Sequence, residues 1–307
     1  MRAFIFPGQG SQAVGMGKAL AEASREARAV FEEVDDALGQ KLSALMAEGP
    51  AEELTLTENA QPAIMANAVA TLRASGIDLQ AKADFVAGHS LGEYSALCAA
   101  GTFDLATTAR LLKQRGQAMQ AAVPVGEGAM AALLGADLTI AQQICEAAAE
   151  GEVCTVANDN DPSQVVISGN RAAIERALEI AKEKGAKRAI LLPVSAPFHC
   201  ALMKPAAEAM QRALANAKME SPKVSLYANV TAAPVDSPDT IRELLVEQVT
   251  GMVRWRESVA AMAGAGVTHF VEFGGKVLGP MVKRIAPDAR VTSVVAMEDI
   301  DALVKEI

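Results

Sequence analysis

The segment Ala83-Asp84-Phe85-Val86-Ala87-Gly88-His89-Ser90-Leu91-Gly92-Glu93 is the most informative part of the chain for predicting the fold. Its apolar run at 85–87 predicts a buried strand, and residues 94–100 predict a helix that ends at Gly101. Between them lies the Gly-x-Ser-x-Gly pattern of a nucleophile elbow, in which a sharp strand-to-helix turn exposes a serine. The neighbouring N–H groups lie at a helix N-terminus, which stabilises negative charge. The segment therefore predicts an α/β fold and a serine that forms an acyl-enzyme.

On both sides of this segment, short β-branched or aromatic runs alternate with alanine-rich helical stretches, which is typical of α/β proteins. We expect further strands at 2–6, 224–229 and 269–273. Helices are expected at 18–38, 61–74, 104–122, 204–217, 240–249, 253–263 and 276–285, with Asp104 at the N-terminus of the third.

A Pro- and Gly-containing break at 124–128 marks a domain boundary. After it we expect strands at 129–134, 153–158, 164–168 and 188–194 and helices at 139–150 and 171–184, with a hairpin loop at 158–163. This βαββαβ order is that of a ferredoxin-like unit. We therefore predict a large α/β-hydrolase-like domain, formed by residues 1–123 and 198–307, with a small ferredoxin-like domain inserted at 124–197.

Composition excludes several functional classes. The chain has 307 residues, of which 51% are hydrophobic, and its net charge of −9 argues against a nucleic-acid partner. No apolar run approaches the roughly 18 residues that span a membrane, and the start has no signal-peptide pattern, so we expect a cytoplasmic protein. The four cysteines lack C-x-x-C spacing and the three histidines are scattered, which argues against a metal site.

A serine nucleophile needs a base within hydrogen-bond reach, and the chain offers three histidines. His89 adjoins Ser90, but neighbours on an elbow point in different directions. His269 begins a predicted strand, which favours a structural role. His199 lies in a Pro-bounded loop between the two predicted domains, where a base could face a cleft, although a lone loop histidine is more often a surface residue.

Two further features have both a structural and a functional interpretation. The turn Pro7-Gly8-Gln9-Gly10 after the first strand is either a plain tight turn or part of an oxyanion hole, in which the N–H groups of Gln9 and Leu91 bind the developing negative charge. Arg115 lies in a predicted helix, where an arginine is usually solvated. An acyl group with its own carboxylate, however, would need a bidentate partner, and arginine is the fitting residue.

Four motifs in this order resemble those of the malonyl-CoA:acyl carrier protein transacylases of type II fatty acid synthesis: Phe6-Pro7-Gly8-Gln9-Gly10-Ser11-Gln12, Gly88-His89-Ser90-Leu91-Gly92-Glu93, Gln114-Arg115-Gly116 and Ala196-Pro197-Phe198-His199. The resemblance covers nearly the whole chain. It implies ping-pong transfer of malonyl from malonyl-CoA to the phosphopantetheine thiol of acyl carrier protein, through a malonyl-serine. It implies no metal or bound cofactor, and we expect a monomer.

The resemblance also implies roles for individual residues. Ser90 would be the nucleophile, and His199 its general base and then the acid to the leaving thiol. Gln9 and Leu91 would supply the oxyanion hole, and Arg115 would pair with the malonyl carboxylate. The remaining implied positions are Gln61 and Asn158 along the acyl or pantetheine cleft, Gln248 orienting His199 through its backbone carbonyl, and Phe198, which with Leu91 resembles the malonyl-selective pattern.

Carrier proteins are acidic, and so is this chain, so docking would need a local basic patch. The candidates are Lys187, Arg188, Lys283 and Arg284, with a merely solvated surface as the alternative. Two departures from the family pattern are Cys200, where serine is common, and the loop at 272–278, which looks one residue short.

Two rival functions stay open. An α/β-hydrolase-type esterase or thioesterase would share the elbow but use water as the acceptor. A carrier-binding module without activity would not need the intact set of Ser90, His199 and Arg115.

Overall fold

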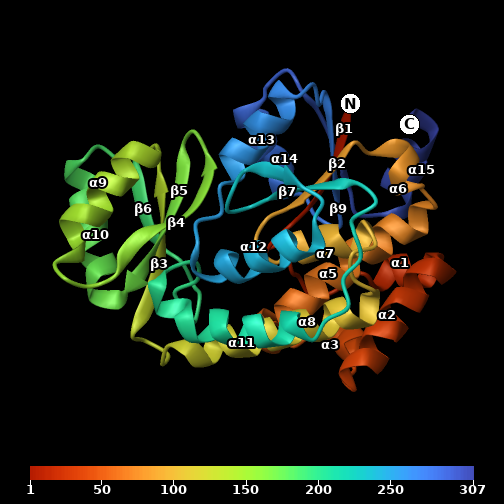
Figure 1. Cartoon of the computed structure of the whole chain (residues 1–307), viewed down its shortest axis with the longest axis horizontal. Coiled ribbons are helices and arrows are strands. Elements are labelled where there is room, and N and C mark those ends of the chain that lie inside the picture. The colour runs from red at the N-terminus through yellow and green to blue at the C-terminus, as the bar shows by residue number, and fades with distance from the viewer.

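The computed structural model describes residues 1–307 and contains two β-sheets flanked by helices (Figure 1). The larger sheet has, in spatial order, strands β10 (Arg290–Val294), β9 (His269–Phe273), β1 (Arg2–Phe6), β2 (Phe85–Gly88), β7 (Ser225–Ala228) and β8 (Ala233–Val235). The first five strands run parallel, and β8 runs antiparallel to β7. The predicted α/β class is confirmed.

Helices precede, connect and follow these strands. They are α1 (Lys18–Ala23), α2 (Arg25–Leu38), α3 (Leu42–Glu48), α4 (Ala51–Thr55), α5 (Thr57–Ser75), α6 (Leu79–Lys82), α7 (Gly92–Ala99), α8 (Leu105–Ala122), α11 (Lys204–Ala215), α12 (Pro238–Thr250), α13 (Trp255–Gly264), α14 (Leu278–Ile285) and α15 (Met297–Glu306), with a 3₁₀ helix at Ala201–Met203. No helix has the length and apolar character needed to cross a membrane.

The central strand β1 divides the core between the two faces of the larger sheet. Its residues 3–6 are fully buried, as expected for a parallel strand covered on both sides. Phe4 and Phe6 point to the face covered by α5, α7 and α8, where both rings contact Phe273. Ala3 and Ile5 point to the opposite face, which is covered by α13 and α14. Because β1 and β2 are parallel neighbours in this packed sheet, the loops that follow them meet at the same edge of the sheet.

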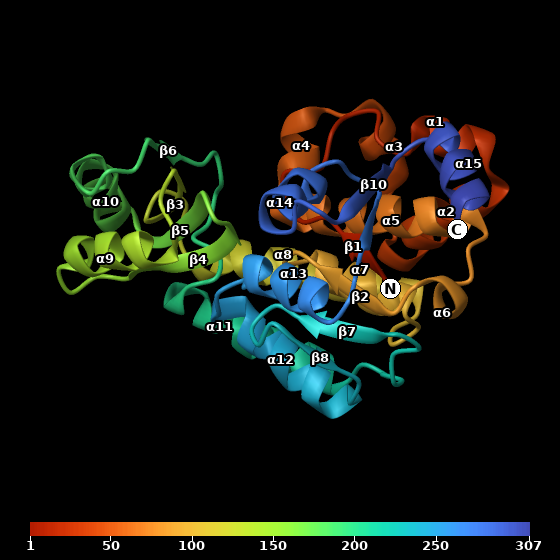
Figure 2. The same cartoon turned by 90° about the horizontal axis from the view of Figure 1, so that it is seen from above.

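The smaller sheet is antiparallel, with the order β4 (Cys154–Asp161), β5 (Gln164–Asn170), β3 (Gly128–Leu134) and β6 (Arg188–Leu191). Helices α9 (Leu138–Ala149) and α10 (Arg171–Glu183) share a separate apolar core with one face of this sheet. Met130, Ala132 and Val166 on the other face belong to the main core. Figure 2 shows this unit at one end of the molecule, away from both termini. Its opposite face therefore turns toward the larger sheet.

Several predicted boundaries were wrong. Strand β4 runs to Asp161, so the predicted loop at 158–163 shrinks to the turn at Pro162 and Ser163. The predicted helix at 18–38 is two helices, because Ser24 has an extended conformation and its side chain caps α2. Strand β6 ends at Leu191, three residues earlier than expected. Strands β8 and β10 and helices α3, α4, α6 and α15 were not predicted.

Candidate active site

The nucleophile elbow has the predicted strand–turn–helix form. Ser90 adopts a φ of 54°, a left-handed conformation that residues other than glycine rarely adopt. A Cβ on Gly88 would lie 1.9 Å from the backbone of Gly92, and a Cβ on Gly92 would lie 2.2 Å from the carbonyl oxygen of Phe6. Only glycine fits at these two positions, because the turn packs directly against the end of β1. The Ser90 N–H donates to Asn229 Oδ1 at 2.8 Å, which ties the turn to the end of β7.

His199 lies next to this serine, although the two are distant in sequence. Its Nε2 is 2.7 Å from Ser90 Oγ, and its Nδ1 is 2.8 Å from the backbone carbonyl oxygen of Gln248. Since a carbonyl oxygen only accepts hydrogen bonds, Nδ1 carries the hydrogen and the Nε2 lone pair faces the serine hydroxyl. This is the arrangement of a general base, with a backbone carbonyl in place of the usual carboxylate.

The surroundings of His199 keep it neutral. Burial, together with the nearby Arg115 cation, lowers the pKa of His199 to about 3. The other two histidines are used elsewhere. His89 Nε2 lies 2.7 Å from Asn160 Oδ1 and its ring lies beside Trp255, while His269 Nε2 lies 2.9 Å from Thr292 Oγ1 at the far end of the sheet.

Arg115 brings a buried cation to the nucleophile. Its side chain is 1% exposed, extends from α8 and lies over the Tyr94 ring. The guanidinium donates to Gln61 Oε1 at 2.7 Å, to Gln248 Oε1 at 2.9 Å and to Ser90 Oγ at 3.2 Å, and Nε has no partner. Burial lowers its pKa, but a guanidinium stays charged at neutral pH. Such a group suits a substrate with a negative charge close to the reacting carbonyl.

A polar network behind Ser90 was not predicted from the sequence, apart from Gln248. Glu93, the residue after the elbow, is 1% exposed, and its Oε2 accepts the N–H of Asn229 at 2.9 Å and Gln248 Nε2 at 3.1 Å. Gln248 Nε2 also lies 3.0 Å from the carbonyl oxygen of Ser90, and Asn229 Nδ2 donates to that of Gly88. The only sequence signal was a charged residue at the start of an otherwise apolar helix.

A cleft of about 380 Å³ opens in front of Ser90, between the two sheets. It contains most of the predicted site residues: Gln9, Gln61, Ser90, Leu91, Arg115, Asn158, Phe198 and His199. Gln248 lies behind the cleft wall instead. The backbone N–H groups of Gln9 and Leu91 donate no hydrogen bond within the chain, which leaves them free for an oxyanion.

The predicted basic patch is only partly available. Arg284 pairs with the buried Asp161 at 2.8 Å, and Lys283 donates to the carbonyl oxygen of Ala289 at 2.7 Å. These two side chains therefore hold the fold together. Lys187 and Arg188, near the start of β6, are exposed and form no ion pair among the charged groups of the chain.

Both segments that depart from the family pattern form local hydrogen bonds. The thiol of Cys200 donates to the carbonyl oxygen of Pro197, within the loop that carries His199. In the loop at 272–278, the Glu272 carboxylate accepts the N–H groups of Val277, Leu278 and Gly279 and so begins α14.

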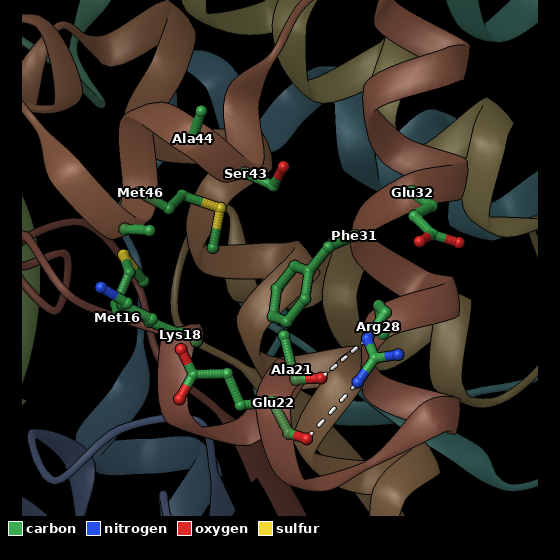
Figure 3. A pocket seen from close by; sticks show the side chains of 12 residues that line it. Met16, Lys18, Ala21, Glu22, Arg28, Phe31, Glu32, Ser43, Ala44 and Met46 are labelled. Atoms are coloured by element: carbon green, nitrogen blue, oxygen red, sulfur yellow. Dashed lines mark hydrogen bonds between the residues drawn. The ribbon is translucent and has the colours of Figure 1, made fainter.

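A second hollow, of about 350 Å³, lies among α1, α2 and α3 (Figure 3). Arg28 extends over it and donates to the carbonyl oxygens of Ala21 and Glu22 at the end of α1. The Ser43 hydroxyl there donates to the Asp35 carboxylate. No histidine or cysteine lines this hollow, whereas Ser90 in the other cleft is paired with a histidine, so the cleft at Ser90 is the candidate active site.

Comparisons with known proteins identify the family of this chain. Residues 3–275 match the family model of the acyl transferase domain. The malonyl CoA-acyl carrier protein transacylase of Bacillus subtilis is 46% identical over 99% of this chain and 96% of its own, and that of Escherichia coli K12 is 48% identical over 92% of each.

Solved structures of malonyltransferases also superpose closely on this chain. The acyl-carrier-protein-S-malonyltransferase of Bartonella henselae is 55% identical and superposes with a TM-score of 0.97 over 99% of this chain and 98% of its own. A malonyl-transacylase in complex with its type II PKS acyl-carrier protein is 40% identical, with a TM-score of 0.95 over 100% of this chain and 99% of its own. This chain belongs to the family of malonyl CoA-acyl carrier protein transacylases.

Proposed function

We propose that this protein transfers the malonyl group of malonyl-CoA to the phosphopantetheine thiol of acyl carrier protein, through a malonyl ester of Ser90. One observation carries the proposal: the buried Arg115 guanidinium lies 3.2 Å from the oxygen of a serine that is paired with His199. A general hydrolase needs the serine and the base, but not a buried cation beside them. The names of the relatives and the carrier-bound neighbour support the same substrates.

The first half-reaction acylates the enzyme. His199 Nε2 takes the Ser90 hydroxyl proton as Oγ attacks the thioester carbonyl, and the resulting oxyanion accepts the N–H groups of Gln9 and Leu91. The intermediate then expels CoA thiolate, which receives the proton from His199. Arg115 holds the malonyl carboxylate meanwhile. In the second half-reaction the carrier thiol gives its proton to His199 and attacks the ester, so that Ser90 Oγ leaves and is protonated.

The chain supplies every group that these steps require, so we infer that no resident metal or cofactor takes part. The four cysteines are free, which fits a reducing compartment such as the cytoplasm. We also infer that the smaller sheet with α9 and α10 is a ferredoxin-like domain inserted into an α/β-hydrolase-like one. Its exposed Lys187 and Arg188 are our candidates for the carrier contact.

Initial-velocity kinetics test the covalent intermediate. With malonyl-CoA and phosphopantetheinylated carrier both varied, we expect parallel double-reciprocal lines, because CoA leaves before the carrier reacts. Intersecting lines would contradict the malonyl-serine route. Release of free malonate at the same rate with and without carrier would instead indicate a thioesterase.

A further inference from the structure

The buried carboxylate of Glu93 has no part in the steps above, yet it belongs to the network that positions them. The Gln248 side chain links it to the cleft: Nε2 donates to Glu93 Oε2 at 3.1 Å, while Oε1 accepts from Arg115 at 2.9 Å. An amide that donates to a carboxylate must turn its oxygen the other way, toward the guanidinium. Glu93 thus fixes which end of the Gln248 amide faces Arg115.

The contact between Glu93 and Gln248 also affects the general base, His199. The backbone carbonyl of Gln248 accepts from His199 Nδ1, and its Nε2 also lies 3.0 Å from the Ser90 carbonyl oxygen. One residue therefore contacts the nucleophile, the base and the cation. Asn229 completes the arrangement, because its N–H donates to Glu93 and its Oδ1 accepts from the Ser90 N–H.

We propose that Glu93 is a positioning residue that acts through Gln248, and that its charge sets the preference of the cleft for an anionic over a neutral acyl group. When Glu93 is ionised, it offsets the positive charge of Arg115. When it is protonated, the guanidinium acts alone on the substrate, and a malonyl carboxylate binds more strongly. This inference rests on the proposed function.

The other titratable groups around Glu93 keep their charge state near neutral pH, so a pH dependence of the substrate preference can be assigned to Glu93. Burial raises the pKa of Glu93 to about 7 and lowers that of His199 to about 3, so only the former changes charge near neutrality. Burial also raises the pKa of Tyr94 and lowers that of His89, which keeps both neutral. Arg115 is the remaining charged neighbour, and it stays protonated.

The test is the ratio of kcat/KM for malonyl-CoA to kcat/KM for acetyl-CoA, measured at about pH 6 and about pH 8. Nucleophile, base and leaving group are common to both substrates, so their pH dependence cancels in the ratio. For the unmodified protein we expect the ratio to fall roughly tenfold with rising pH, the size that a coupling of about one pKa unit gives.

Three variants sharpen the test. Glu93→Gln keeps an oxygen acceptor for Gln248 and Asn229 but has no charge, so its ratio should stay high and not change with pH. Glu93→Ala removes the acceptor, so kcat should fall for both substrates. Asp35→Asn, at another buried carboxylate that contacts Ser43 and does not line the cleft, should behave like the unmodified protein.

A ratio in the unmodified protein that is the same at both pH values would overturn the inference, as would a Glu93→Gln variant that keeps the original pH dependence. Neither result affects the proposed function, which is tested separately by whether the unmodified protein transfers malonyl to the carrier through Ser90.

Discussion

Replacing Arg115 with alanine should lower kcat/KM for malonyl-CoA but not for acetyl-CoA, because only the malonyl group carries a carboxylate. The guanidinium is buried and its two terminal nitrogens already contact Gln61, Gln248 and Ser90, so a malonyl carboxylate would meet a desolvated, pre-oriented cation. Losing one partner of a buried, hydrogen-bonded charge pair costs about 2–5 kcal/mol. At about 1.4 kcal/mol per factor of ten, kcat/KM for malonyl-CoA should fall roughly 30- to several-thousand-fold.

Acetyl-CoA is the internal control for this variant, because it uses the same serine and base without a carboxylate. Its kcat/KM should be unchanged or higher in Arg115→Ala. The assay is single-turnover acylation with each thioester, with thermal unfolding measured alongside to show that the variant is folded. Arg115→Lys should give an intermediate loss, since a lysine keeps the charge but not the bidentate geometry. An equal loss for malonyl and acetyl would refute the carboxylate role.

Three further predictions concern the elbow, the base and the carrier contact. Gly88→Ala should destabilise the fold by at least about 1–3 kcal/mol in denaturant unfolding, because the new Cβ has no space, whereas Gly264→Ala, which meets nothing within 4 Å, should not. Between about pH 6.5 and pH 3, His199 is neutral in the folded protein but protonated in the unfolded chain. The free energy of unfolding should therefore fall as the pH drops through this range, and His199→Gln should make that fall smaller. Arg188→Glu should raise the KM for carrier several-fold at low salt and leave the KM for malonyl-CoA unchanged. Arg284→Glu should instead lower the melting temperature, because it loses the ion pair with the buried Asp161.

Local patterns in the sequence were sufficient where one segment determines its own structure. The apolar run at 85–87 and the two elbow glycines predicted the strand–turn–helix that places Ser90, half-buried, at the cleft. Asp104 caps α8 as expected, accepting from the Thr107 N–H. Edge strands β8 and β10 were missed because they are short and only partly buried, so their apolar residues do not form a clear alternating pattern.

The end of β4 was missed for a different reason. Asp159 and Asp161 are polar residues of the kind that usually mark a loop, yet both are buried. Arg256 and Arg284, from the far end of the chain, neutralise them. No local pattern contains that information.

The active site likewise depends on contacts between distant positions, which local sequence patterns do not reveal. Residue types and motif order pointed to Ser90, His199 and Arg115, because their chemistry is distinctive. Glu93 and Asn229 are ordinary residues whose importance arises only when the fold brings positions 136 residues apart into contact. A single sequence carries no signal of that kind.

Intact-protein mass measurement tests the central claim most directly. After mixing with malonyl-CoA, the protein should gain the mass of one malonyl group, located on the peptide that contains Ser90. Adding phosphopantetheinylated carrier protein should return the original mass and add the malonyl group to the carrier. Ser90→Ala should show no gain. Absence of any adduct, or its loss at the same rate without carrier, would contradict transfer through a malonyl-serine.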